Sequence, residues 1–263
     1  MPNPIKLMMA SAVGKVPPEY LLFTWGNQRA GYLGNNLDAN IQVSSPVQIG
    51  AAEWVTQGWS NKTSVGIKTE YTAWVWGYNT PYGTVGVGTV ANVSSPTQLG
   101  SATTWTKGPA GGGTGGSQHM GAIQSGKLFM WGKNGSGQCG NGVVIASSPV
   151  QVGSLTTWDN FSMGGNHTGA VDTAGKLWTW GNCHVGQLGH GNVILHSSPV
   201  QVGSLTTWSQ VRCAENHCVA LKTDGTLWAW GDGGSGQLGQ GNTVVYSSPV
   251  QIGSLTTWAN FDT

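Results

Sequence analysis

The sequence predicts an all-β protein, a five-bladed β-propeller built from four-stranded antiparallel blades. The first observation behind this prediction is a repeat. Residues 147–158 recur unchanged at 197–208 and, with isoleucine in place of one valine, at 247–258. Looser copies lie at residues 44–54 and 94–105. Copies at a period of about fifty residues are typical of propellers and solenoids, in which each unit buries its apolar face against its neighbours.

The second observation is a Trp-Gly dipeptide that runs in step with this repeat. It begins at Trp25, Trp76, Trp131, Trp180 and Trp230, at intervals of 51, 55, 49 and 50 residues. The third observation is the lack of any run of ten or more residues with apolar side chains at helical spacing. The sequence therefore favours strands and turns throughout. We expect the repeat tryptophans, Trp258 included, to lie in the core.

One repeat, residues 158–203, shows the expected strands individually. The first three are predicted at 158–161, 167–171 and 176–180, separated by turns that contain glycine. The fourth is predicted at 198–202 and begins at Pro199. Proline suits the first residue of a strand because it has no amide hydrogen to donate to the ladder.

The two ends of the chain predict one domain, residues 1–263, that closes into a ring. The last copy continues into residues 254–263, which resemble the first strand of a further repeat. The first repeat lacks that strand, because residues 7–15 align with the second one. We therefore expect the C-terminal strand to complete the N-terminal blade, which removes unpaired sheet edges. The apolar patch at residues 8–13 is then a strand, and no signal peptide is expected.

The composition excludes several function classes. Eleven basic and ten acidic residues leave a net charge of +1, so the chain has no general positive field for nucleic acid. No apolar run reaches the length that spans a membrane, so we expect no membrane insertion. Fourteen tryptophans and only 8% charged residues are not typical of a disordered chain.

The motifs resemble a known family. Residues 208–230, WSQVRCAENHCVALKTDGTLWAW, combine with the recurring GQLG, SSPVQV and TTW segments. Together they resemble the regulator of chromosome condensation repeat over residues 7–263. The resemblance implies a β-propeller and, among family members, nucleotide exchange on a small GTPase, chromatin docking, inhibition or protein binding. This chain has five units instead of seven, few charges and no basic tail, and no exchange-factor motif matches its residues. Exchange activity is therefore not expected, since a fold alone does not define a function.

Catalytic residues, metals and cofactors are not expected. His119, His167 and His217 share one repeat position, where each is predicted to be buried and bonded to a backbone carbonyl of its own blade. No serine lies in a GxSxG motif, and no GK[ST] follows the glycines at 111–116. The four cysteines lack CxxC spacing; Cys139 replaces the leucine of the GQLG turn and is interpreted as a small buried side chain, and Cys213 and Cys218 could meet across a hairpin, although a disulfide is not favoured.

A binding surface is expected where the repeats differ while the scaffold stays the same. The loops before each Ser-Ser-Pro vary in this way, at residues 37–43, 90–93, 143–146, 193–196 and 243–246, and so do the turns at 27–32 and 78–82. Tyrosine, tryptophan and arginine are enriched at interfaces. The candidate interaction residues are Arg29, Tyr32, Trp59, Tyr78, Tyr82, His184, His196 and Tyr246.

We therefore expect a non-enzymatic binding or structural protein. Its partners would be other proteins of an assembly or a surface receptor. Propellers of this repeat type resemble accessory proteins encoded by bacteriophages, which suggests a virion structural or adhesion component located in the virion. One alternative is a cytoplasmic or secreted module that regulates or inhibits a protein target. Another is a lectin that binds a glycan through Trp59, Tyr78 or Tyr246. The oligomeric state, the partner and the binding face stay open.

Overall fold

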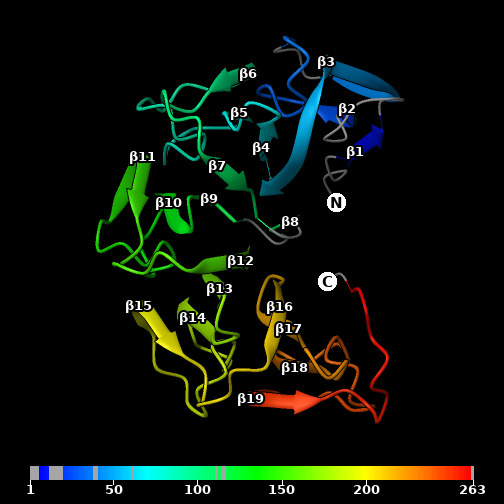
Figure 1. Ribbon diagram of the computed structural model, residues 1–263, viewed down its shortest axis with the longest axis vertical. Helices are drawn as coiled ribbons and strands as arrows, with labels where there is room; N and C mark the ends of the chain where they lie inside the picture. Colours follow the sequence, from blue (N-terminus) through cyan, green and yellow to red (C-terminus); the bar gives the residue numbers. More distant parts are fainter. Residues whose placement is uncertain are drawn as a thin grey trace.

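All regular elements of the protein are β-strands. The computed structural model describes residues 6–11, 20–37, 41–60, 62–109, 112–113 and 117–261, and within these ranges no helix occurs. No helix able to cross a membrane is therefore found in this part of the chain. The strands form three four-stranded antiparallel sheets and one seven-stranded sheet. Figure 1 shows the sheets arranged around a common centre, as in a propeller.

Two sheets near the C-terminus follow the predicted blade closely. One consists of β12 (Trp158–Met163), β13 (His167–Asp172), β14 (Leu177–Gly181) and β15 (His196–Gln201). The next consists of β16 (Trp208–Cys213), β17 (His217–Lys222), β18 (Leu227–Gly231) and β19 (Tyr246–Gln251). In both, the strands pair in chain order. The strands predicted for residues 158–203 are confirmed, each bound lying within two residues of its expected place.

The third four-stranded sheet comprises β7 (Trp105–Lys107), β9 (His119–Gln124), β10 (Lys127–Lys133) and β11 (Ile145–Gln151). Its first strand is short, and the glycine-rich insertion follows it. Within this insertion, β8 (Gly112–Gly113) pairs in parallel with residues 59–60 of the preceding repeat.

The first two repeats share one sheet, whereas the sequence predicted two separate blades. In chain order this sheet contains β1 (Lys6–Ser11), β2 (Tyr20–Gln28), β3 (Ile41–Ser60), β4 (Thr63–Lys68), β5 (Ala73–Gly77) and β6 (Val93–Gln98). The first half of the 20-residue β3 pairs with β2, and its second half pairs with β4. The connection from Gly50 to Trp54 is one residue shorter than that from Gly153 to Trp158. Ile49 pairs with Leu22 and Trp54 pairs with Tyr20, so residues 50–53 form a bulge within β3 instead of a loop between two strands.

Neighbouring repeats are joined by a tryptophan that packs on a glycine. Gly189 has a φ of +76°, and a Cβ there would lie 2.9 Å from Nε1 of Trp230, so a side chain would both strain the backbone and strike the ring. The Trp230 indole N–H donates a hydrogen bond of 2.9 Å to the Gln187 carbonyl. The same packing of a glycine against an indole ring joins Gly34 to Trp76, Gly86 to Trp131 and Gly140 to Trp180. The GQLG and Trp-Gly signatures are thus the two halves of one joint.

The described residues do not make this joint between the last repeat and the first. A Cβ at Gly239, which corresponds to Gly189, would meet Ile252 of its own repeat and no tryptophan. Trp25, which the sequence predicted to lie in the core, is only partly buried. Figure 1 shows the segment after β19, in red, on the side of the ring that leads toward β1, in blue.

The C-terminal strand expected within residues 254–263 is not formed in the described part of that segment. Residues 255–261 belong to no strand, and residues 262–263 lie outside the described ranges. Trp258 is 36% exposed, whereas its repeat counterpart Trp208 is 3% exposed. The prediction that Trp258 is a core residue is therefore wrong for this structure. Because residues 255–261 form no strand, Trp258 belongs to no sheet, and its indole stays partly exposed.

Candidate functional site

The predicted interaction residues are distributed over several places instead of forming one cluster. Arg29 and His184 are exposed, while Tyr32 is buried against Tyr78 with the ring centroids 6.3 Å apart. His196 lies edge-on to His190 at 5.1 Å. Tyr82 lies under the ammonium group of Lys133. The hydroxyl of the half-buried Tyr246 accepts a hydrogen bond from Asn242.

Trp59 lies apart from the other candidates. It sits near the end of β3 and lines a hollow of about 570 Å³ together with Arg212 and Phe261. The Arg212 guanidinium lies 5.4 Å from the Phe261 ring. The strands that reach this hollow come from several repeats, so Trp59 faces the middle of the molecule. The variable loops lie at the ends of the sheets.

Exposed aliphatic side chains recur in the loop before every Ser-Ser-Pro. They are Leu37, Ile41, Val90, Val143, Val144, Ile145, Val193, Ile194, Leu195, Val244 and Val245. Val144 is 72% exposed and Val193 and Ile194 are each 61% exposed. Each loop joins the third strand of a repeat to the fourth, so all of them lie at the same end of their sheets. These loops were predicted from the sequence as variable segments, but their shared exposed aliphatic side chains were not predicted.

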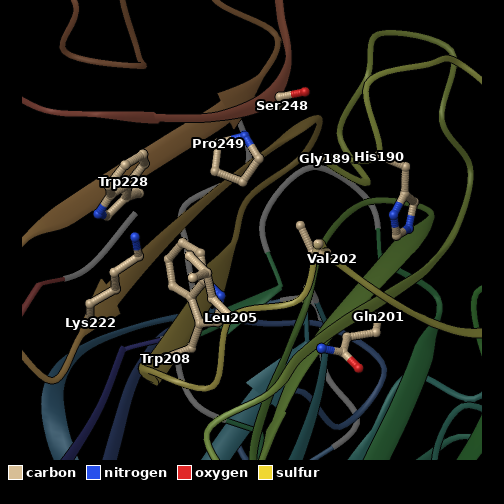
Figure 2. Close-up of a pocket in the computed structure, with 11 residues that line it drawn as sticks. Gly189, His190, Gln201, Val202, Leu205, Trp208, Lys222, Trp228, Ser248 and Pro249 are labelled. Atoms are coloured by element: carbon tan, nitrogen blue, oxygen red, sulfur yellow. The ribbon is translucent and has the colours of Figure 1, made fainter.

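A groove lies between the β12–β15 sheet and the β16–β19 sheet (Figure 2). Its volume is about 520 Å³. Trp208 and Trp228 lie against each other edge to face, with centroids 6.1 Å apart. The Lys222 ammonium lies 3.7 Å from the centroid of Trp228 and 4.9 Å from that of Trp208. Val202, Leu205 and Pro249 add apolar surface to the lining.

Lys222 is a buried cation without an ion-pair partner. It is 8% exposed, and among the described residues no carboxylate oxygen lies within 4.0 Å of its ammonium. Burial lowers the pKa of Lys222, and the charge of Asp224 opposes that change. The Asp224 carboxylate instead accepts hydrogen bonds from the backbone N–H and the hydroxyl of Thr226, at 3.0 and 2.6 Å.

The same position in two other repeats carries a satisfied charge. Lys68 of β4 forms an ion pair of 2.7 Å with Glu53 while it lies over Trp74. Asp172 of β13 accepts hydrogen bonds from the backbone N–H groups of Ala174 and Lys176, each at 3.0 Å. It also accepts one from the indole N–H of Trp178 at 3.1 Å. Of Lys68, Asp172 and Lys222, Lys222 is thus the residue whose charged group lies against aromatic rings without an ion pair or a hydrogen bond to any described residue.

Two histidines at the shared repeat position are wholly buried, but they bond to the neighbouring sheet and not within their own. Nε2 of His119 lies 3.1 Å from the Thr168 hydroxyl, and Nε2 of His167 lies 3.1 Å from the sulfur of Cys218. Burial lowers the pKa of each imidazole to about 3. Both are therefore neutral at pH 7. The predicted bond to a carbonyl of the same blade is wrong, because each ring reaches across the joint.

Cys213 and Cys218 form a disulfide, whereas the sequence analysis favoured unpaired cysteines. The turn at residues 214–217 places them directly opposite each other on β16 and β17, with Cα atoms 4.2 Å apart. Such close approach is typical of pairs that exchange no backbone hydrogen bonds. The sulfurs and a nitrogen of His167 lie within 4.8 Å of one another, a grouping that could hold a metal ion. Once the sulfurs are joined, only the imidazole remains as a ligand.

The fold and its motifs define an RCC1-type β-propeller. The model of the regulator of chromosome condensation (RCC1) repeat matches residues 125–171, 174–221 and 224–259. A second model of the same repeat matches residues 208–237. The chain belongs to the RCC1 repeat family, which confirms the resemblance drawn from its sequence.

Parts of this chain are similar in sequence to two curated proteins. The human E3 ubiquitin-protein ligase HERC2 is 28% identical over 173 residues, which is 64% of this chain and 4% of HERC2. Mouse Alsin is 34% identical over 83 residues, which is 27% of this chain and 5% of Alsin. The chain therefore spans a small part of these curated relatives.

Solved structures show the same fold. Human WBSCR16 superimposes with a TM-score of 0.75 at 21% identity, covering 90% of this chain and 65% of that one. Yeast RCC1 (Prp20), solved with Kap60, gives a TM-score of 0.76 at 18% identity, covering 91% of this chain and 59% of that one. At these identities the likeness shows the fold alone.

Proposed function

We propose that this chain is a non-catalytic β-propeller that binds another protein through the face formed by its variable loops. The carrying observation is the set of exposed aliphatic side chains in the same loop of every repeat. Contiguous exposed apolar surface marks sites of interaction, because its burial against a partner removes it from water. The fold supports the proposal by analogy, since the similar yeast RCC1 was solved bound to a protein, Kap60.

A protein partner suits this face better than a glycan. Valine, isoleucine and leucine at the loop tips offer no hydrogen bonds to sugar hydroxyls. Of the aromatic residues considered as sugar platforms, Tyr78 packs on Tyr32 and Trp59 lies on the central hollow.

The test is to purify the native protein from its source cells with whatever binds it. A Val144→Asp/Ile194→Asp variant places charge on two exposed loop tips and should reduce recovery of the partner about tenfold or more, the effect of a lost hot spot. Tyr71→Asp is the control, since Tyr71 is 50% exposed but lies in the turn between β4 and β5. An unchanged set of co-purified proteins in the loop variant would contradict the proposal.

We also propose that five repeats close into a ring, with residues 254–263 completing the first blade. The free outer edge of β1 and the unfilled joint at Gly239 support this closure. Amides of residues 258–261 should then be protected from hydrogen exchange to the same extent as those of β16, which pairs with β17. Deletion of 254–263 would lower the unfolding midpoint and cause aggregation. Fast exchange at these amides with an unchanged midpoint would rule closure out.

A role as a virion structural or adhesion component, located in the virion, gains no support from the relatives compared. It stays a prediction, and recovery of the protein in purified particles would test it. A cytoplasmic regulatory module is the alternative location and role. Both accommodate a protein-binding face.

A further inference from the structure

We propose that the groove beside Lys222 binds a carboxylate of a partner protein, an aspartate or glutamate side chain carried by an extended segment. This site is separate from the loop face, and the inference does not rest on the function proposed for that face. It names a second surface and the chemistry that would recognise it.

Within the described part of the chain, the ammonium group of Lys222 lacks the partners that a buried cation requires. Removing a cation from water is costly unless an anion or hydrogen-bond acceptors replace the lost hydration. An ammonium group has three N–H donors. Among the described residues none of those on Lys222 is paired with an oxygen acceptor; the rings of Trp208 and Trp228 lie beside it, and the Asp224 carboxylate acts on its charge without forming an ion pair. A carboxylate entering the groove would complete the coordination of this buried charge.

The second repeat shows what such a completed site looks like. There Lys68 lies over Trp74 and Trp54 and is paired with Glu53 at 2.7 Å. The position of Glu53 corresponds to Thr207. The backbone bonds confirm this correspondence, since the N–H of Thr69 donates to the Glu53 carbonyl at 2.9 Å and that of Thr223 to the Thr207 carbonyl at 2.8 Å. The groove therefore has the lysine and both aromatic rings of its counterpart but lacks the carboxylate.

The shape of the groove suits a side chain that joins a carboxylate to an apolar stem. Figure 2 shows the Lys222 amino group beside Trp208 and Trp228, with Pro249 and Val202 further along the lining. Its volume of about 520 Å³ exceeds one side chain and leaves room for neighbouring residues of an extended segment. Aromatic and aliphatic walls would pack on the methylene groups while the ammonium binds the acid.

The experiment uses phenylacetate as the probe and phenylacetamide as its neutral twin, because the two differ mainly in charge. Their binding to the whole chain is followed by NMR through the indole N–H resonances of Trp208 and Trp228. We expect phenylacetate to shift these resonances in a saturable manner and phenylacetamide to leave them in place. Lys222→Gln should weaken phenylacetate binding about tenfold or more, the size of a charged hydrogen bond.

Two further variants separate the proposal from a loss of folding. Thr207→Glu restores the carboxylate found in the second repeat, so it should block phenylacetate by pairing with Lys222 while the fold is kept. Lys68→Gln is the matched control and should leave binding unchanged, since Lys68 is already paired. Equal binding of the two probes, or equal binding by wild type and Lys222→Gln, would overturn the proposal. The loop-face variant Val144→Asp/Ile194→Asp should bind phenylacetate normally, so failure of one site is distinguishable from failure of the other.

Discussion

The β12–β15 sheet and the β16–β19 sheet have almost the same fourth strand and connecting loop, yet their first two strands carry different chemistry. Residues 247–258 repeat residues 197–208 with Ile252 in place of Val202, and the two sheets share the same strand register. The differences lie in the hairpins. Met163 and Thr168 of the first correspond to the disulfide pair Cys213 and Cys218 of the second.

The joint between repeats restricts the residue type at some positions and leaves the residue type at others free to vary. The tryptophan and the glycine on which it packs recur because neither tolerates another side chain in that contact. The second strand, in contrast, ends where the groove begins, so its last residue faces a different neighbourhood in each repeat. Asp172 and Lys222 occupy this one position with opposite charges.

The largest expected difference in stability is between the tryptophans that pack in the joint between repeats and Trp258, which does not. Trp180→Ala and Trp230→Ala should each lower the free energy of unfolding by about 3–5 kcal/mol, because each removes a wholly buried ring. With Trp258 36% exposed and in no strand, Trp258→Ala should change it by no more than about 0.5 kcal/mol, whereas the ring closure proposed above should raise the loss toward that of Trp230→Ala. Urea unfolding measures all three. A large loss for Trp258→Ala would instead indicate a closed ring in solution.

The pH dependence of stability should differ between His167 and His217. The folded pKa of His167, about 3, lies below the value of about 6.5 expected when unfolded, so its contribution is complete above pH 6.5 and declines as the pH falls toward 3. Between pH 7 and pH 5 the free energy of unfolding should fall by about 2 kcal/mol for this residue. His217 is only partly buried, and its pKa is lowered as well. We expect His167→Asn to flatten the pH dependence more than His217→Asn does; equal flattening would contradict the assigned burial.

Exchanging one hairpin's side chains for the other's tests the disulfide. A Cys213→Met/Cys218→Thr variant reproduces the pair found in β12 and β13. Without reductant it should be less stable than wild type by about 2 kcal/mol, the loop-entropy value for so short a closed loop. With a reducing agent present, the gap between the two proteins should largely close. A gap that is insensitive to reductant would show that packing, and not the covalent link, separates the hairpins.

The smallest expected effects concern the two opposite charges. Asp172→Asn should cost about 1.5 kcal/mol, because the carboxylate accepts hydrogen bonds from two backbone N–H groups and an indole. Lys222→Met should change stability by less than about 1 kcal/mol, since the lost cation–π contacts are offset by removing a buried charge. Thermal or urea unfolding of both variants checks the order. A loss for Lys222→Met larger than that for Asp172→Asn would reverse the comparison.

Much of the architecture was predictable because it depends on local and repeated signals. The spacing of the Trp-Gly dipeptides and the glycine turns between apolar runs predicted the strands of the β12–β15 sheet nearly residue by residue. The variable loops were also predictable as candidates, since they change while the scaffold recurs. The exposed aliphatic tips could have been found in the sequence by comparing those loops for hydrophobicity instead of for aromatic residues.

Other features depend on which side chains meet across sheets, and no spacing in the chain reports that. The importance of Lys222 follows from the absence of a partner at Thr207, which is visible only beside the Lys68–Glu53 pair. The partners of His119 and His167 come from the next sheet, 49 and 51 residues further along the chain.

The sequence by itself determined the strand content and the repeat period, because alternation of side chains and turn chemistry act over a few residues. Only the tertiary structure decided that β3 runs through two repeats, that a glycine and a tryptophan form the joint between repeats, that Cys213 joins Cys218, and that Trp258 is 36% exposed. The physical reason is that burial and charge pairing depend on neighbours from distant parts of the chain, and near-identical segments acquire different neighbours at different places in the ring.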